Sequence, residues 1–209
     1  MSVNYSKFTE SVLEKIKNSP KKPTLLLHVC CAPCSSYVLE YLSAFFEITL
    51  YYYNPNISPE SEYNFRLNEL SRLVSEMPNL SGVKIVSENY NPTEFFEIAK
   101  GYESLPEGGE RCKRCYYLRL KRSAKYAAEN GFNFFTTTLS ISPHKNAEWL
   151  NEIGEELSKT YNIPYLFSDF KKKNGYKRSI ELSAIYNLYR QDYCGCVYSK
   201  EFSKSLNTK

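Results

Sequence analysis

The chain has 209 residues, of which 24% are charged and 42% hydrophobic, and its formal net charge is +4. This length suffices for one domain that buries a core without disulfide support. No run of about 18 apolar residues is present that could span a bilayer, and the polar, helix-like opening contains no cleavable apolar signal. We therefore expect a cytoplasmic protein with no membrane partner.

Apolar runs alternate with helical patterns along the whole chain. In chain order they predict a strand at 24–29, a helix at 35–46, a strand at 47–54, a helix at 58–77, a strand at 82–88, a helix at 91–101, a helix at 113–130, a strand at 132–139, a helix at 142–161, a strand at 163–170 and a helix at 176–190. We expect Ser35 or Ser36 to cap the helix at 35–46, and Ser142 to cap the helix at 142–161. This alternation predicts an α/β fold with a parallel sheet flanked by helices, of Rossmann type, as one domain over residues 1–209.

Polar and cysteine-rich sequences follow three of the predicted strands. CCAPC (30–34) follows the first strand, YYNPN (52–56) closes the second, and TTTLSISP (136–143) closes the fourth. In a parallel sheet, ligands bind at the carboxyl ends of the strands. We therefore expect these three segments to share one edge of the sheet.

Seven cysteines fall into three local clusters: CCAPC, the CxxC pair Cys112 and Cys115, and the CxC pair Cys194 and Cys196. A single cysteine is most often an inert core thiol, but an odd set of clustered thiols in a reducing compartment favours metal or redox chemistry over disulfides. The residues alone leave three alternatives open. These are an iron-sulfur cluster, a structural zinc held by the CxxC and CxC pairs, and a dithiol redox pair within CCAPC.

Six motifs in order resemble QueH, the cobalamin-independent epoxyqueuosine reductase family. They are HVCCAPCSSYVLEYL, YYYNPNISPESEYNFRLNEL, GGERCKRCYYLRL, FFTTTLSISPHKN, DFKKKNGYKRS and YRQDYCGCVYS, and together they extend over about residues 24–200. The resemblance implies a HUP-like fold and the two-electron reduction of the epoxide of epoxyqueuosine, at the wobble position of tRNA, to queuosine. It also implies a 4Fe-4S cluster beside a second mononuclear iron, with an external electron donor.

Members of the broader HUP group that activate substrates with ATP carry a phosphate loop of the SGGxDS kind, which this sequence lacks. CCAPCS stands at the corresponding turn after the first strand. We therefore expect no use of ATP. Two rival functions remain open at this level: a zinc-stabilised tRNA-binding module, and a small dithiol oxidoreductase.

From the resemblance we expect all seven cysteines to be metal ligands: Cys30, Cys31, Cys34, Cys112, Cys115, Cys194 and Cys196. Cys112 and Cys115 are assigned to the cluster, and the division of the other thiols between the two metals is left open. Cys30, Cys31 and Asp192 are the candidate catalytic residues. Asp192, two residues before Cys194, is a candidate ligand or proton donor, and its alternative is a solvated acidic residue.

The candidate substrate-binding residues lie in the remaining motifs. They are Tyr53, Asn54, Asn56, Glu62, Arg66, Thr137, Lys172 and Arg178. Several of them have a structural alternative, while Asn54 and Asn56 are expected to orient the modified base. Glu62 and Arg66 are spaced as an i,i+4 helix pair, Thr137 suits a strand exit before a helix, and Lys172 and Arg178 suit a solvated basic face. Aromatic stacking on an anticodon base is the role considered for Tyr53.

Overall fold

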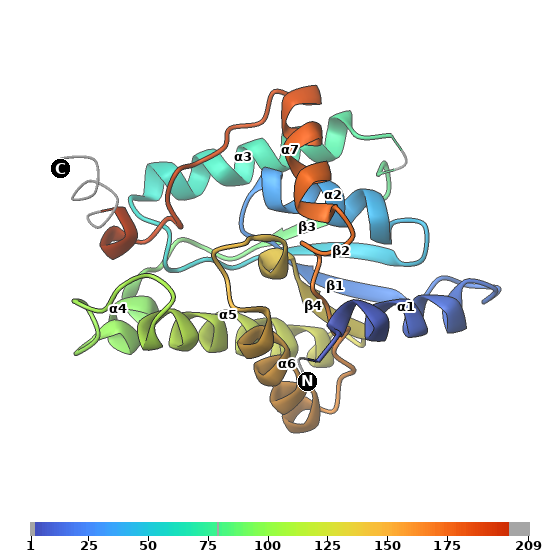
Figure 1. Cartoon of the computed structure of the whole chain (residues 1–209), viewed down its shortest axis with the longest axis horizontal. Helices are drawn as coiled ribbons and strands as arrows, with labels where there is room; N and C mark the ends of the chain where they lie inside the picture. The colour runs from blue at the N-terminus through green and yellow to red at the C-terminus, as the bar shows by residue number, and fades with distance from the viewer. Residues whose placement is uncertain (1–2, 79, 201–209) are drawn as a thin grey trace.

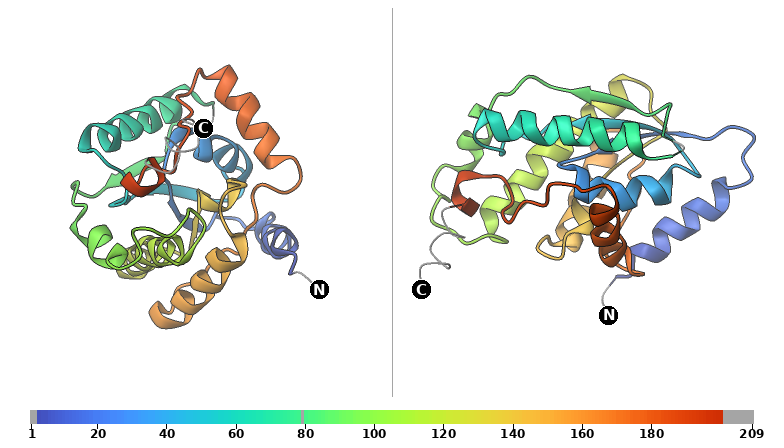
Figure 2. Two further views of the ribbon diagram at one scale, coloured as in Figure 1. Left: turned by 60° about the vertical axis from the view of Figure 1, so that its left-hand side comes forward. Right: turned by 90° about the horizontal axis from the view of Figure 1, so that it is seen from above.

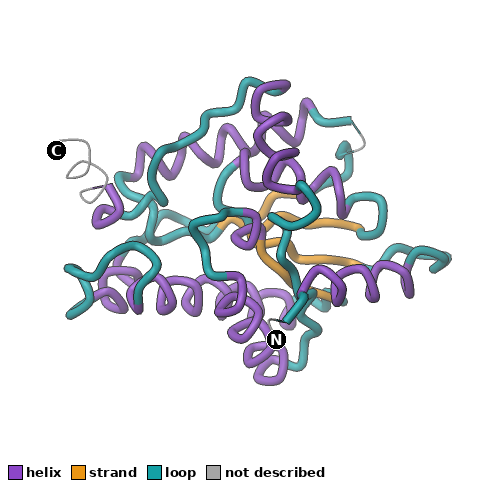
Figure 3. Tube along the Cα trace, viewed as in Figure 1, coloured by secondary structure: helices purple, strands orange, loops and turns teal. Residues whose placement is uncertain are grey.

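Four short strands form one parallel sheet at the centre of the folded molecule (Figure 3). The computed structural model describes residues 3–78 and 80–200, so part of the predicted span 1–209 lies outside the described residues. The strands are β1 (Thr24–His28), β2 (Glu47–Tyr52), β3 (Lys84–Ser87) and β4 (Phe134–Thr137), in the order β3-β2-β1-β4. His28, at the end of β1, lies opposite Tyr51 and Thr137. The strands therefore end together at one carboxyl edge.

Helices cover both faces of the sheet (Figures 1 and 2). They are α1 (Tyr5–Ile16), α2 (Ala32–Leu42), α3 (Glu60–Glu76), α4 (Thr93–Ala99), α5 (Glu110–Glu129), α6 (Ala147–Tyr161) and α7 (Gly175–Ile185). Helices α2, α3 and α7 pack on one face, and α4, α5 and α6 on the other. The predicted α/β fold with a flanked parallel sheet is confirmed. Within the described residues, no helix combines the length and apolar character needed to cross a membrane.

The strands divide the hydrophobic core into two halves, because successive side chains of a strand point to opposite faces. Leu25 and Leu27 pack into the half beneath α2 and α3, whereas Leu26 packs into the half beneath α5 and α6. Tyr52 and Tyr51 divide in the same way. All of these side chains are buried. Alternate residues of β1 and β2 therefore face different helix layers, α2 and α3 on one side of the sheet and α5 and α6 on the other.

The predicted strand at 163–170 is wrong beyond a single bridge, which joins Phe135 to Tyr165. The chain leaves the sheet immediately afterwards because a side chain takes the place of a neighbouring strand. Asn151 accepts a hydrogen bond from the Ser168 amide at 2.9 Å and donates one to the Ser168 carbonyl at 2.8 Å. The apolar pattern of this segment indicates burial. The Leu166 amide still donates to the Phe135 carbonyl of β4 at 2.9 Å, whereas α6 supplies the two bonds to Ser168.

Two predicted helix starts are also corrected. Helix α2 begins at Ala32, with Cys31 in the N-cap position and Pro33 in the first turn. Ser35 lies inside the helix, where its hydroxyl donates to the Cys31 carbonyl at 2.8 Å. Helix α6 begins only at Ala147, and its cap is Asn146. A 3-10 turn, η1 (Thr138–Ile141), separates β4 from that cap.

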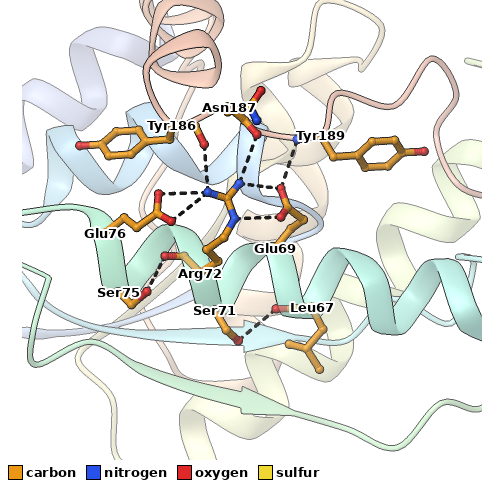
Figure 4. Close-up of polar contacts among 9 residues, drawn as sticks. All are labelled: Leu67, Glu69, Ser71, Arg72, Ser75, Glu76, Tyr186, Asn187 and Tyr189. Carbon is orange, nitrogen blue, oxygen red and sulfur yellow. Dashed lines mark hydrogen bonds and ion pairs between the residues drawn. The ribbon is translucent and has the colours of Figure 1, made fainter.

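Helix α3 anchors the segment that follows α7 (Figure 4). Arg72 donates to the Tyr186 carbonyl at 3.0 Å and to the Asn187 carbonyl at 3.2 Å. Its guanidinium is held by Glu69, which also accepts the Tyr189 amide at 3.2 Å. From this anchor the chain runs along α3 toward the carboxyl edge of the sheet, between α3 and α5 (Figure 2). The last cysteine pair is thereby brought to that edge.

Candidate metal centre

Three thiols gather where β1 turns into α2. The sulfur atoms of Cys30, Cys31 and Cys34 all lie within 4.8 Å of one another. Cys30 and Cys31 are buried and Cys34 is half-buried. The helix starts directly after the strand, so these thiols stand at a helix N-terminus, where partial positive charge favours thiolates.

The three thiols share their protons unequally. Hydrogen bonds from Cys30 and Cys34 hold the pKa of Cys31 well below its ordinary value, and the charge of Arg66 acts in the same direction. The pKa of Cys34 is raised well above its ordinary value by hydrogen bonding to Cys30 and Cys31, and burial adds to this. One negative charge is therefore stable in this group, and a bound cation is needed before all three thiols lose their protons.

A second group of thiols comes from α5 and from the C-terminal segment. Cys112 and Cys115 lie one turn apart on the same face of α5. Cys194 and Cys196 approach that face from the segment after α7, and the four cysteines line one small cavity. The structure thus joins the CxxC and CxC motifs, which are about 80 residues apart in the sequence, in one site.

Backbone and side-chain donors shape this second group. The Gly108 amide lies 3.3 Å from the sulfur of Cys112, and the Ser199 amide lies 3.3 Å from the sulfur of Cys196. The Cys194 carbonyl accepts a hydrogen bond from Arg66 at 3.2 Å. Amide hydrogens directed at sulfur stabilise thiolates, as they do at iron-sulfur sites.

Buried cations surround the two groups. Lys145 is 11% exposed and pairs with Glu107 at 3.8 Å. Desolvation lowers the pKa of Lys145, but the charges of Cys194, Tyr116 and Glu107 outweigh this effect and raise the pKa above its ordinary value. Arg119 is buried, and the thiols whose charges act on it are Cys115, Cys194 and Cys30. Arg119 lines the cavity of the four thiols, and its charge also acts on Cys30 of the other group. Positive charges buried beside thiols require thiolate or another anion to balance them.

The donor sets fit metal ligation in two different ways. The group of Cys30, Cys31 and Cys34 can hold one ion by three sulfur atoms, which leaves a coordination position open for another molecule. The four-thiol group supplies a complete set of protein ligands for a zinc ion or an iron-sulfur cluster. Soft thiolates with no histidine partner select such metals over magnesium or calcium.

Several of the predicted substrate residues are fixed by structural contacts. Asn54 is buried, donates to the Val29 carbonyl at 2.9 Å and accepts from Arg119 at 3.2 Å. The ring of Tyr53 is buried, and its hydroxyl donates to Glu94 at 2.9 Å. These contacts link the end of β2 to α4 and α5.

Thr137 takes part in a buried chain of hydrogen bonds at the end of β4. Its hydroxyl accepts the Leu139 amide at 3.1 Å and lies 2.9 Å from Nδ1 of His28. The other ring nitrogen of His28 lies 3.2 Å from the Tyr53 carbonyl. Burial lowers the pKa of His28 to about 3, so this histidine is neutral. It therefore acts here as a buried link between strands.

Glu62 and Arg66 form the helix pair that their spacing allows, with 2.7 Å between Arg66 Nε and a carboxylate oxygen. Arg66 is nevertheless fully buried and reaches the Cys194 carbonyl, so the pair belongs to the thiol site. Asn56 is buried too, and its side-chain amide has no hydrogen-bond partner among the described residues. Such an unpaired buried amide is costly and is typical of functional sites.

The basic residues of the DFKKKNGYKRS motif lie elsewhere. Lys172 borders a hollow lined by α1 and α2 side chains, among them Thr9 and Tyr41. Arg178 on α7 forms a two-pronged ion pair with Glu40 of α2. Neither lines the cavity of the four thiols. Asp192 is exposed on the segment that leads to Cys194.

Two cations near the thiols, Arg119 and Lys145, are not among the site residues expected from the sequence. Arg119 follows Cys112 and Cys115 at helical spacing, so all three occupy one face of α5. That spacing could have revealed it. No sequence signal marks Lys145, because its low exposure and its pairing with Glu107 depend on tertiary contacts of the segment between η1 and α6.

Comparison with known proteins identifies the family. A family model described as epoxyqueuosine reductase QueH matches residues 25–202. The chain belongs to the QueH family. A QueH from Streptococcus pyogenes serotype M1 is 44% identical over 199 residues, which cover 94% of this chain and 78% of the relative. A QueH from Staphylococcus epidermidis is 43% identical over 94% of this chain and 84% of its own length. A QueH from Thermotoga maritima is 35% identical over 84% of this chain and 90% of its own length. The resemblance carried by the six motifs is thus confirmed.

Proposed function

We propose that this protein is an epoxyqueuosine reductase that acts on tRNA carrying epoxyqueuosine at the wobble position. Two electrons from an external donor and two protons remove the epoxide oxygen as water, and queuosine remains in the tRNA. One observation carries the proposal: a member of the QueH family brings seven thiols and their buried cations to the carboxyl edge of its sheet, where open α/β folds bind ligands.

The two thiol groups are proposed to hold different metals. A tetrahedral zinc site, with Zn–S of about 2.3 Å, places its thiolates roughly 3.8 Å apart. Within the described chain, the group of Cys30, Cys31 and Cys34 is the set of thiols with this compactness. The four-thiol group is more open, which favours a 4Fe-4S cluster over a single ion. The compact group, with its open position, is then the site of the second mononuclear iron.

When bound, the iron supplies a Lewis acid for the epoxide oxygen and the cluster supplies single electrons. The residues of the chain orient the substrate and supply protons. Arg66 and Asn56, buried with unpaired donors, are proposed to hold the modified base, with Glu62 fixing Arg66. Exposed Asp192 is proposed to take protons from solvent and deliver one to the departing oxygen.

Lys172 and Arg178 are proposed to contact tRNA phosphates away from the thiols. Arg178 already binds Glu40 and Glu181, so phosphate contact there exchanges one anionic partner for another. Binding through such contacts weakens as the salt concentration rises.

The proposal is tested with anaerobically reconstituted protein and tRNA that carries epoxyqueuosine, with nucleosides analysed by mass spectrometry. The wild type should form queuosine. Cys112→Ala should lose both the visible chromophore and activity, because it removes a ligand of the four-thiol group. Cys34→Ala should keep the chromophore and lose at least about 100-fold in activity. His144→Ala, at an exposed position, is the control and should behave as wild type.

Three other results would contradict the proposal. Colourless protein with about one zinc per chain and no turnover would indicate a zinc-stabilised RNA-binding module. Turnover of model disulfides without iron would indicate a dithiol oxidoreductase. Full activity of Cys112→Ala would remove the four-thiol group from the reaction.

A further inference from the structure

Arg119 stands out among the buried residues of the site. It lies one turn after Cys115 on α5 and its side chain is 1% exposed. One terminal nitrogen donates to Asn54 at 3.2 Å. Its Nε and its other terminal nitrogen are buried and have no hydrogen-bond acceptor among the described residues. A buried guanidinium with two free donors is costly unless an anion completes it.

The cavity that Arg119 lines identifies that anion. Its lining contains the four thiols of Cys112, Cys115, Cys194 and Cys196 and no carboxylate. The charge of Cys30, from the other thiol group, also acts on Arg119. Asn54, which is fixed to the Val29 carbonyl at 2.9 Å, holds the guanidinium in place from the side of the sheet. Arg119 therefore lies against the four thiols with two guanidinium nitrogens that have no acceptor among the described residues.

We propose that Arg119 is the shared counter-ion of the two thiol groups, a positioning residue that neutralises thiolate charge when metals bind. The inference rests on the proposed function in requiring metals at these groups. Four thiolates around a divalent ion, or around an oxidised 4Fe-4S cluster, carry a net charge of minus two in both cases. Arg119 lowers the cost of burying that charge and makes each group more receptive to electrons and metal.

Arg111 provides a matched control in the same cavity. It is also a buried arginine, 2% exposed, and lies on the first turn of α5. One terminal nitrogen donates to three carbonyls, those of Tyr102, Glu103 and Leu105, at 3.0, 2.7 and 2.5 Å. The Nε of Arg111, like that of Arg119, is buried without an acceptor among the described residues. Arg111 differs in that three backbone carbonyls meet its charge whether or not metal is bound, and it ties the loop before α5 to the helix.

The first experiment titrates metal-free protein with Co²⁺ and follows the thiolate-to-cobalt absorption. Arg119→Met should bind Co²⁺ about 10- to 100-fold more weakly than wild type, while its metal-free form melts at or above the wild-type temperature. Arg119→Lys, which keeps the charge, should recover part of the affinity. Arg111→Met should instead lower the melting temperature of the metal-free protein.

The second experiment measures the reduction potential of the iron-loaded protein. Arg119→Met should have a more negative potential than Arg119→Lys, since a positive charge beside the metal favours the reduced state. Equal Co²⁺ affinity for Arg119→Met and wild type would overturn the inference and leave the proposed function intact. So would a loss of affinity accompanied by a lowered melting temperature in both Arg119 variants. Absence of cobalt–thiolate absorption in the wild type would overturn both proposals.

Discussion

Gly195 separates the two cysteines of the C-terminal motif and has a backbone angle φ of +113°, which L side chains rarely adopt. Its carbonyl accepts the Ser58 amide at 3.0 Å. A Cβ atom there would lie 3.0 Å from both Arg66 Nη1 and Ile57 Cγ1. The glycine therefore lets the loop turn both thiols toward α5 while it stays close to α3.

We expect Gly195→Ala to cost about 1–3 kcal/mol in the free energy of unfolding and to lower the iron bound per chain, because Cys194 and Cys196 are displaced. Chemical denaturation and iron analysis measure the two effects. Gly82→Ala is the control, since a Cβ atom at Gly82 meets nothing within 4 Å. Wild-type iron content in Gly195→Ala would show that the loop does not depend on this backbone conformation.

At the scale of residues, the thiols could be predicted and their environment could not. The clustering of seven cysteines marks them as candidate site residues, although their types and spacing alone leave iron-sulfur, zinc and dithiol chemistry open. Arg119 and Lys145 look like surface cations in the sequence. Arg119 is buried where α5 packs on β1 and β4, and Lys145 is 11% exposed beside Glu107. The division of seven thiols into three and four likewise depends on tertiary contacts between segments distant in sequence.

At the scale of elements, α3 acts as the support of the C-terminal cysteine pair. Hydrogen bonds from Arg72 lower the pKa of Glu69. Burial raises it by a smaller amount, and the hydrogen bond from the Tyr189 amide lowers it further. The pKa of Glu69 therefore lies below its ordinary value. A carboxyl group with a lowered folded-state pKa stabilises the protein above its unfolded-state pKa, and this contribution is lost as the pH falls through the folded value.

We therefore expect Glu69→Gln to lower the free energy of unfolding by about 0.5–1 kcal/mol at pH 7, a small effect because Arg72 is 35% exposed. The difference from wild type should shrink as the pH falls below 4.5, the ordinary value for this group. Urea denaturation at several pH values tests this. Glu155→Gln, in an exposed pair with Lys159, should change stability by less. If the stability difference between wild type and Glu69→Gln grew as the pH fell, the pKa of Glu69 would not be lowered in the folded protein.

The strands and most helices could be predicted because each carries its own periodicity, as β1 and α5 do. The failures have local causes. At 163–170 the side chain of Asn151 bonds both backbone groups of Ser168 where a neighbouring strand is expected. After the 3-10 turn at Thr138–Ile141, Asn146 replaces the serine cap that the sequence offers. Such competition between side-chain and backbone partners is not visible in a hydrophobic pattern.

At the scale of the whole molecule, we expect the fold to persist without metal. The two halves of the core contain the sheet and the main helices, and few of their buried side chains are metal ligands. The segment 188–200 is held mainly by its links to α3 and by the thiol site. Metal removal should therefore preserve the far-ultraviolet circular dichroism and expose this segment to proteolysis. Global unfolding of the metal-free protein would contradict this.

The central claim is that two adjacent thiol groups hold two different iron centres. Crystals of anaerobically prepared protein, with anomalous scattering measured on both sides of the iron absorption edge, test it most directly. We predict a strong, multi-atom iron peak among Cys112, Cys115, Cys194 and Cys196, and a separate single iron at Cys30, Cys31 and Cys34. A single metal peak, or a zinc signal at the four-thiol group, would contradict the account.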